Sequence, residues 1–200
     1  IFDQAARQRV AMSRAIVYAS REPEINYWPE RHWEKMFVRN TEFEINNRND
    51  VDARTLWHYQ AICVSPNLLS TTPGVGTAYL TCFRDENGLY LLGDKNYKLT
   101  VPSNPPVKRF WAVTAYDPLS RSLLDSEGPI TVSSTREHVK NADGTVDIYF
   151  SPEPPKDPKL KSNWIKTDPT KGFFVVFRFY GPLEGYINKT WVMNDFELLK

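Results

Sequence analysis

The chain has 200 residues, 41% of them hydrophobic, and its 25 Lys and Arg against 24 Asp and Glu give a formal net charge of +1. That length can bury a sizeable core in one or two domains. The balanced charge favours neither nucleic acid nor an anionic membrane surface as a partner, and no apolar run approaches the ~20 residues that span a bilayer. We therefore expect a folded protein with no nucleic-acid partner and no membrane span.

Residues 1–72 are predicted to form a helical segment. Apolar residues recur at helical spacing over residues 2–17, which predicts an amphipathic helix. Residues 28–33 are interpreted as a turn into a short helix. A third helix is expected to start at residues 50–52, where an Asp can cap it, and to end before Pro66.

From Pro73 onward the hydrophobic period changes to two, the period of a half-buried strand. Strands are expected over residues 77–84, 89–92, 97–101, 109–116, 129–134, 145–150, 173–180 and 190–199. Short strands separated by turn signals are typical of a β-sandwich or jelly roll, and long helices do not alternate with them as a parallel α/β sheet requires. The predicted fold class is mainly β, a jelly-roll-like antiparallel β-sandwich over residues 73–200 with an N-terminal helical segment.

The cysteines and histidines do not suggest a metal or a cofactor. Cys63 and Cys82 are far apart and form no CxxC motif, so two buried thiols and one disulfide are both compatible with the sequence. The histidines, none of which has metal-ligand spacing, are His32, His58 and His138. We expect no tightly bound transition metal and no cofactor.

The most informative polar constellation is residues 116–122, which run Tyr-Asp-Pro-Leu-Ser-Arg-Ser. Arg121 could bind a ligand carboxylate or phosphate there, with Asp117 orienting it across the turn and Tyr116 beside them. In the alternative interpretation, Asp117 caps a β-turn and Arg121 pairs with it. A turn needs this chemistry in any case, so the structural interpretation is favoured.

Arg178 interrupts an otherwise apolar strand. Such a charge either lies at the rim of a cavity, where it would bind a ligand, or is paired inside the sandwich with a carboxylate such as Asp117 or Asp147. Both remain open at this point. By alternation, the residues predicted on the same face as Arg178 are Phe174, Val176 and Tyr180.

A series of short motifs runs through residues 50–200, among them Gly74-Val-Gly-Thr-Ala-Tyr79, Phe110-Trp111, Tyr116-Asp117, Arg121-Ser122, Asn141-Ala-Asp-Gly144, Asn163-Trp164, Lys171-Gly172, Tyr180-Gly-Pro182 and Lys189-Thr-Trp191. Together they resemble the domain-of-unknown-function 1214 family. The resemblance implies a jelly roll that forms the C-terminal part of a larger bacterial protein, after a domain of the 1254 family and a helical segment. It also implies a periplasmic or secreted setting, with the cytoplasm as the alternative, and a missing N-terminal domain as a partner.

Two functions are compatible with the sequence. The first is a non-catalytic β-sandwich module that binds an unknown small molecule or polymer, or packs against the missing domain or other subunits of a homo-oligomer. The second is a hydrolase with a polar pocket lined by Asp117, Arg121 and Arg178. Convergence of these three side chains in an open cavity would favour the enzyme, and separate, satisfied pairs would favour the module. The candidate ligand-binding residues are Tyr116, Asp117, Arg121 and Arg178.

Overall fold

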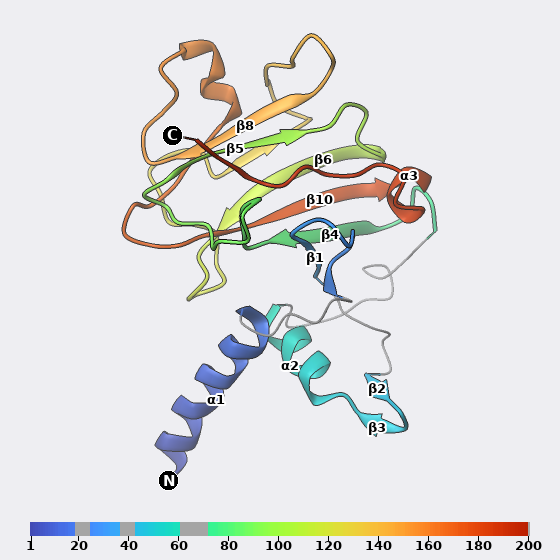
Figure 1. The fold of residues 1–200 in the computed structure, drawn as a ribbon, viewed down its shortest axis with the longest axis vertical. Coiled ribbons are helices and arrows are strands. Elements are labelled where there is room, and N and C mark those ends of the chain that lie inside the picture. The colour runs from blue at the N-terminus through green and yellow to red at the C-terminus, as the bar shows by residue number, and fades with distance from the viewer. Residues whose placement is uncertain (19–24, 37–42, 61–71, 200) are drawn as a thin grey trace.

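Two β-sheets face each other, and two helices project from one side of them (Figure 1). The computed structural model describes residues 1–18, 25–36, 43–60 and 72–199. Strand exceeds helix in this part of the chain, and the described strand pairs are antiparallel except where β8 meets β9. The prediction of a mainly β fold with antiparallel sheets and an N-terminal helix is confirmed, whereas jelly-roll connectivity stays a prediction.

The first sheet has five strands in the order β1-β4-β10-β6-β7. Its central strand, β10, pairs with β4 on one side and with β6 on the other. Strict alternation along β10 puts its odd-numbered apolar residues inside the sandwich and its even-numbered residues on the outer face. The bounds are β1 Trp33–Lys35, β4 Thr77–Cys82, β10 Phe174–Pro182, β6 Val107–Tyr116 and β7 Thr131–Ser133.

The second sheet has four strands in the order β11-β5-β8-β9. The β8–β9 pair is parallel because a Pro-rich loop and a 3-10 helix, Pro158–Asn163, carry the chain back before β9 starts. Trp164 holds the end of this loop against β8, because its indole Nε1 donates to the Ser151 carbonyl at 3.0 Å. The bounds are β11 Glu197–Leu199, β5 Asn96–Val101, β8 Val146–Ser151 and β9 Trp164–Lys166.

The core lies between the two sheets and is rich in aromatic rings. Phe177 is fully buried, and its ring centroid lies 5.7 Å from that of Trp111 and 4.6 Å from that of Phe179. From the opposite sheet, Phe150 packs against Phe173 and Phe196. Trp111, Val113 and Ala115 of β6 also point into this core, as the period of two predicted for a strand over residues 109–116 requires.

Two of the helices, both from the N-terminal part of the chain, stand on the outer side of the five-stranded sheet (Figure 1). These are α1, Phe2–Tyr18, and α2, Val51–Gln60. A small hairpin of β2, Glu44–Ile45, and β3, Arg48–Asn49, precedes α2. A short helix, α3, Glu184–Ile187, follows β10. The predicted cap of α2 is confirmed, because Asp50 Oδ1 accepts the Ala53 N–H at 2.9 Å. Neither α1 nor another described helix combines the length and apolarity that crossing a bilayer requires.

The interpretation of residues 28–33 as the start of a helix is wrong. Trp33 instead opens β1, which pairs with β4 as an edge strand. The physical reason is the indole ring, which is fully buried in the sandwich and whose Nε1 donates to the Asn194 carbonyl at 2.8 Å. A helix would not hold Trp33 inside the core and Glu34 on the opposite face, as a strand does.

Two expectations about the chain's organisation are not decided by this arrangement. The division into a helical segment, 1–72, and a sandwich, 73–200, stays a prediction, although β1 places residues of the first part in a sheet of the second. Cys82 is a fully buried free thiol whose pKa is raised by burial. Cys63 lies outside the described residues, and so does a bridge between the two.

Candidate functional site

Arg178 shares its face of β10 with Phe174 and Val176, as alternation predicts, but this is the outer face of the five-stranded sheet and not the inside of the sandwich. In β10 it is flanked on that face by Val176 and Tyr180, while its neighbours in register are Tyr79 on β4 and Ala112 on β6.

Phenol rings surround the Arg178 guanidinium. Its Nη2 donates a hydrogen bond to the Tyr116 hydroxyl, and its Cζ lies 5.4 Å from the Tyr116 ring centroid and 5.8 Å from that of Tyr79. Burial raises the pKa of Tyr79, against the opposing effect of Arg178, and the nearby hydroxyls of Tyr180 and Tyr116 raise it further. At neutral pH the Tyr79 hydroxyl is therefore protonated and can donate.

Neither carboxylate considered as a partner of Arg178 contacts it. Asp147 accepts from Thr100 Oγ1 at 2.5 Å in the other sheet, and Asp117 pairs with Lys171. Over the described ranges, no carboxylate oxygen lies within 4.0 Å of the Arg178 guanidinium. The interpretation of Arg178 as half of a structural ion pair with Asp117 or Asp147 is thus wrong, because both acids are held elsewhere.

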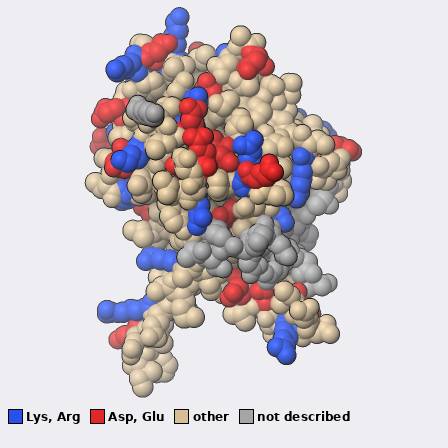
Figure 2. Space-filling model, viewed as in Figure 1, with Lys and Arg blue, Asp and Glu red and all other residues tan. Residues whose placement is uncertain are grey.

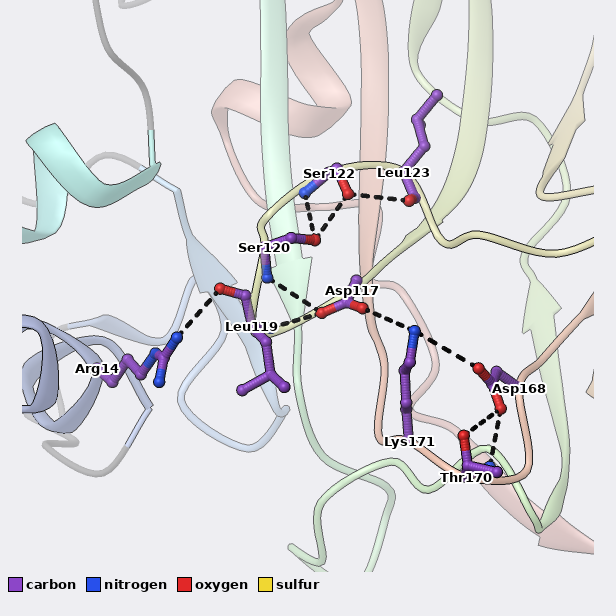
Figure 3. Close-up of polar contacts among 9 residues, drawn as sticks. All are labelled: Arg14, Asp117, Leu119, Ser120, Ser122, Leu123, Asp168, Thr170 and Lys171. Carbon is purple, nitrogen blue, oxygen red and sulfur yellow. Dashed lines mark hydrogen bonds and ion pairs between the residues drawn. The ribbon is translucent and has the colours of Figure 1, made fainter.

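Asp117 stabilises its own turn (Figure 3). Its Oδ1 accepts the N–H groups of Leu119 at 2.7 Å and Ser120 at 3.1 Å, and its Oδ2 lies 3.3 Å from Lys171 Nζ. Burial alone would raise the pKa of Asp117, but these hydrogen bonds and the ammonium outweigh it, so the pKa lies below its usual range. Lys171 also reaches Asp168, at 3.6 Å.

The Arg121 side chain contacts residues of both helices and of the sheet, and it does not pair with the Asp117 carboxylate. Its guanidinium lies 4.2 Å from the Phe174 ring centroid and 5.4 Å from that of Tyr59, and its Nη1 donates to Tyr18 Oη at 3.0 Å. Tyr18 Oη in turn donates to the Pro118 carbonyl at 2.7 Å. The turn-capping interpretation of Asp117 is therefore confirmed, whereas the predicted contact between Asp117 and Arg121 is only the backbone bond of the turn.

The structure brings together some of the four predicted residues and separates the others. Tyr116 and Arg178 are in direct contact. Arg121 is separated from this pair by the ring of Phe174, which contacts the Arg121 guanidinium and stacks on Tyr116 with centroids 5.3 Å apart. Asp117 faces Lys171 and takes no part. Tyr79 was missed, because its approach to Arg178 depends on the register between β4 and β10, which sequence alone does not show.

This arrangement is suited to holding an anion. A guanidinium offers paired donors that match a carboxylate or a phosphate, and phenol hydroxyls can add further donors. The phenol rings give the same site flat apolar walls. Among the described residues, the contacts of the Arg178 guanidinium are with the phenol groups of Tyr116 and Tyr79 and not with a carboxylate, a histidine or a thiol.

We expect no stoichiometric transition metal in the protein. Within the described ranges, no group of three or more His, Cys, Asp or Glu side chains is arranged to hold a metal ion. Elemental analysis of protein purified without chelators should find less than a molar equivalent of zinc, iron or copper. One metal ion per chain would contradict this expectation.

The fold defines a two-sheet β-sandwich protein with helices on the outer face of one sheet. Residues 76–184 match the DUF1214 family, described as proteins of unknown function, and the chain belongs to this family. No curated protein matches the chain.

Two solved structures are similar. The VPA0106 protein from Vibrio parahaemolyticus is 21% identical with a TM-score of 0.57, over 74% of this chain and 35% of that one. A putative uncharacterized protein from Burkholderia cenocepacia is 19% identical with a TM-score of 0.48, over 74% of this chain and 33% of that one. The first supports the fold. The chain spans about a third of the length of these solved relatives.

Proposed function

We propose that this chain is a non-catalytic ligand-binding module that holds the carboxylate or phosphate of a small molecule or polymer at Arg178. The observation that carries the proposal is a half-buried guanidinium contacted by the Tyr116 hydroxyl and by the rings of Tyr116 and Tyr79. Holding a partly desolvated charge on an apolar sheet face without an opposite charge is costly. An anionic ligand would supply that charge.

The alternative proposal, a hydrolase, has less support from the geometry. Its pocket requires Asp117, Arg121 and Arg178 to converge. Asp117 is engaged by two backbone N–H groups and Lys171, and Arg121 by Tyr18 and the aromatic rings around it. Two of the three side chains thus form separate, satisfied groups, which is the arrangement expected of a binding module.

The proposal also includes the larger protein to which this module would belong. The module would be the C-terminal part of a larger bacterial envelope or secreted protein that also carries a domain of the 1254 family. The greater length of the solved relatives supports an additional domain. The envelope setting follows from the family resemblance, and a homo-oligomer remains an alternative way to cover the exposed surfaces.

Substitution Arg178→Met should leave the protein folded and abolish anion binding. We expect inorganic phosphate or benzoate to raise the Tm of the wild-type protein, because a ligand at a hundredfold excess over its Kd stabilises the native state by about 2.7 kcal/mol. The same anions should leave the Tm of Arg178→Met unchanged. Thermal unfolding with and without each anion measures this difference.

Arg109→Met is the matched control, since Arg109 lies on the neighbouring strand β6 but is exposed and donates to the Gly76 carbonyl. Its anion response should equal that of the wild type. Equal stabilisation of Arg178→Met and the wild type would contradict the proposal, and so would the absence of any anion response in the wild type.

A further inference from the structure

The surface between α1 and α2 forms a groove. The two helices meet near the sheet, where Val17 packs against Leu56, and their N-terminal ends diverge (Figure 1). Between them is a groove of about 400 Å³. The residues that line it include Arg9 and Val10 from α1 and Val51, Arg54, His58 and Tyr59 from α2.

The helices expose more apolar surface than their own packing requires. Val17 is the buried residue of α1, while the exposed fractions are 91% for Phe2, 64% for Met12 and 65% for Val51. Val10, inside the groove, is 42% exposed. Val10 and Val51 therefore expose apolar area at the groove itself, and a partner that covers them removes that area from water.

The groove is also positively charged. Its lining contains Arg9, Arg54 and His58 and no acidic residue. The whole of α1 contains three arginines and one acidic residue, Asp3. Figure 2 shows blue side chains along this projecting helix. A partner that fills the groove must therefore bring apolar groups together with carboxylates.

Shape and charge distinguish between the candidate occupants. A second copy of this chain would offer its own basic α1, which would place like charges opposite each other. A bilayer surface is flat and cannot reach the lining of a groove between two helices. An amphipathic helix can, because its apolar stripe fits between two helices and its flanking residues meet Arg9 and Arg54.

We propose that the groove between α1 and α2 receives an acidic amphipathic helix of a protein partner, with its apolar stripe on Val10 and Val51 and its carboxylates on Arg9 and Arg54. The groove then acts as a docking site that completes a three-helix arrangement on the sandwich. This inference does not depend on ligand binding at Arg178.

Two synthetic helical peptides test the proposal. One carries Leu along one face with Glu on both sides of the stripe, and the other has Lys at every Glu position. Fluorescence anisotropy with the wild-type chain should show the Glu peptide binding at least about tenfold more tightly than the Lys peptide, as expected when several complementary charge pairs form. Added salt should reduce this difference.

The double variant Arg9→Glu/Arg54→Glu should invert the preference, so that the Lys peptide binds more tightly. Both side chains are exposed on helix surfaces, and circular dichroism would verify that the helices persist. Val10→Asp should weaken the Glu peptide by at least about tenfold through loss of the apolar contact.

Three outcomes would overturn the proposal. Equal affinity of the two peptides, or no measurable binding of either, would show that the groove does not select an acidic helix. A dimer in sedimentation velocity that Val10→Asp dissociates would assign the groove to a second copy. Binding to vesicles of phosphatidylglycerol and phosphatidylcholine, without binding of the Glu peptide, would assign it to a membrane surface.

Discussion

Phe177→Ala should lower the free energy of unfolding by about 3–5 kcal/mol, the cost of removing a large ring from a packed core. Phe177 is fully buried at the centre of β10, and its ring contacts those of Trp33, Trp111 and Phe179. Trp33 and Trp111 belong to other strands, β1 and β6, which are held in the sheet by their own pairing and do not move in readily to close the resulting cavity. Urea unfolding followed by tryptophan fluorescence measures the loss.

Phe2→Ala provides the matched control, because the same side chain is 91% exposed in α1. Its effect on the free energy of unfolding should stay within about 0.5 kcal/mol, as for other surface substitutions. If Phe177→Ala costs no more than Phe2→Ala, the odd-numbered face of β10 does not form the core and the sandwich described above is wrong.

Asp117→Ala is expected to destabilise the protein by about 1–2 kcal/mol, the usual cost of losing a side-chain acceptor for backbone N–H groups. The change removes the acceptor of the Leu119 and Ser120 N–H groups and the partner of Lys171. Asp117→Asn should cost less, because its amide oxygen can still accept from the turn. The anion response at Arg178 should persist in both variants.

The stabilisation of the folded state by the Asp117 charge should decrease as the pH falls. The folded-state pKa of Asp117 is below its unfolded value of about 3.9. The stabilisation is therefore present at neutral pH and is lost as the pH falls through the folded-state pKa. The stability difference between wild type and Asp117→Asn should shrink in strongly acidic solution. A difference that stays constant down to acidic pH would show that the charge contributes nothing.

The fold was predictable where the hydrophobic period was regular. In β6 and β10, alternation alone separates the inner side chains from the outer ones, since successive strand residues point to opposite faces. Trp33 was misplaced because β1 is a three-residue strand, too short to show a period. What holds it in place is the burial of its indole beside residues distant in sequence, and local pattern carries no information about that contact.

The candidate site was predictable only in part, for a related reason. Alternation predicted which residues of β10 share a face with Arg178, but whether that face is inside or outside, and what the side chain contacts, depends on which strands pair and in which register. Proximity in sequence suggested that Asp117 and Arg121 would bind each other. Instead Arg121, whose backbone has a φ of +62°, carries its side chain to Phe174 and Tyr18, where aromatic rings stabilise the cation.

This position of Arg121 connects the two parts of the molecule. Its guanidinium lies between the outer face of the sheet, at Phe174, and the C-terminal ends of α1 and α2, at Tyr18 and Tyr59. Phe174 and Tyr116 form a stacked pair that reaches from Arg121 to Arg178.

The most direct test of the central claim is the NMR signal of the Arg178 Nε–H group during a titration with benzoate. If Arg178 is the anion-binding residue, its side-chain resonance should shift and saturate, while that of Arg121, held by Tyr18 and aromatic rings, should stay in place. Arg178→Met identifies the resonance by its disappearance. An Arg178 resonance that does not move at benzoate concentrations that saturate the thermal stabilisation would contradict the account.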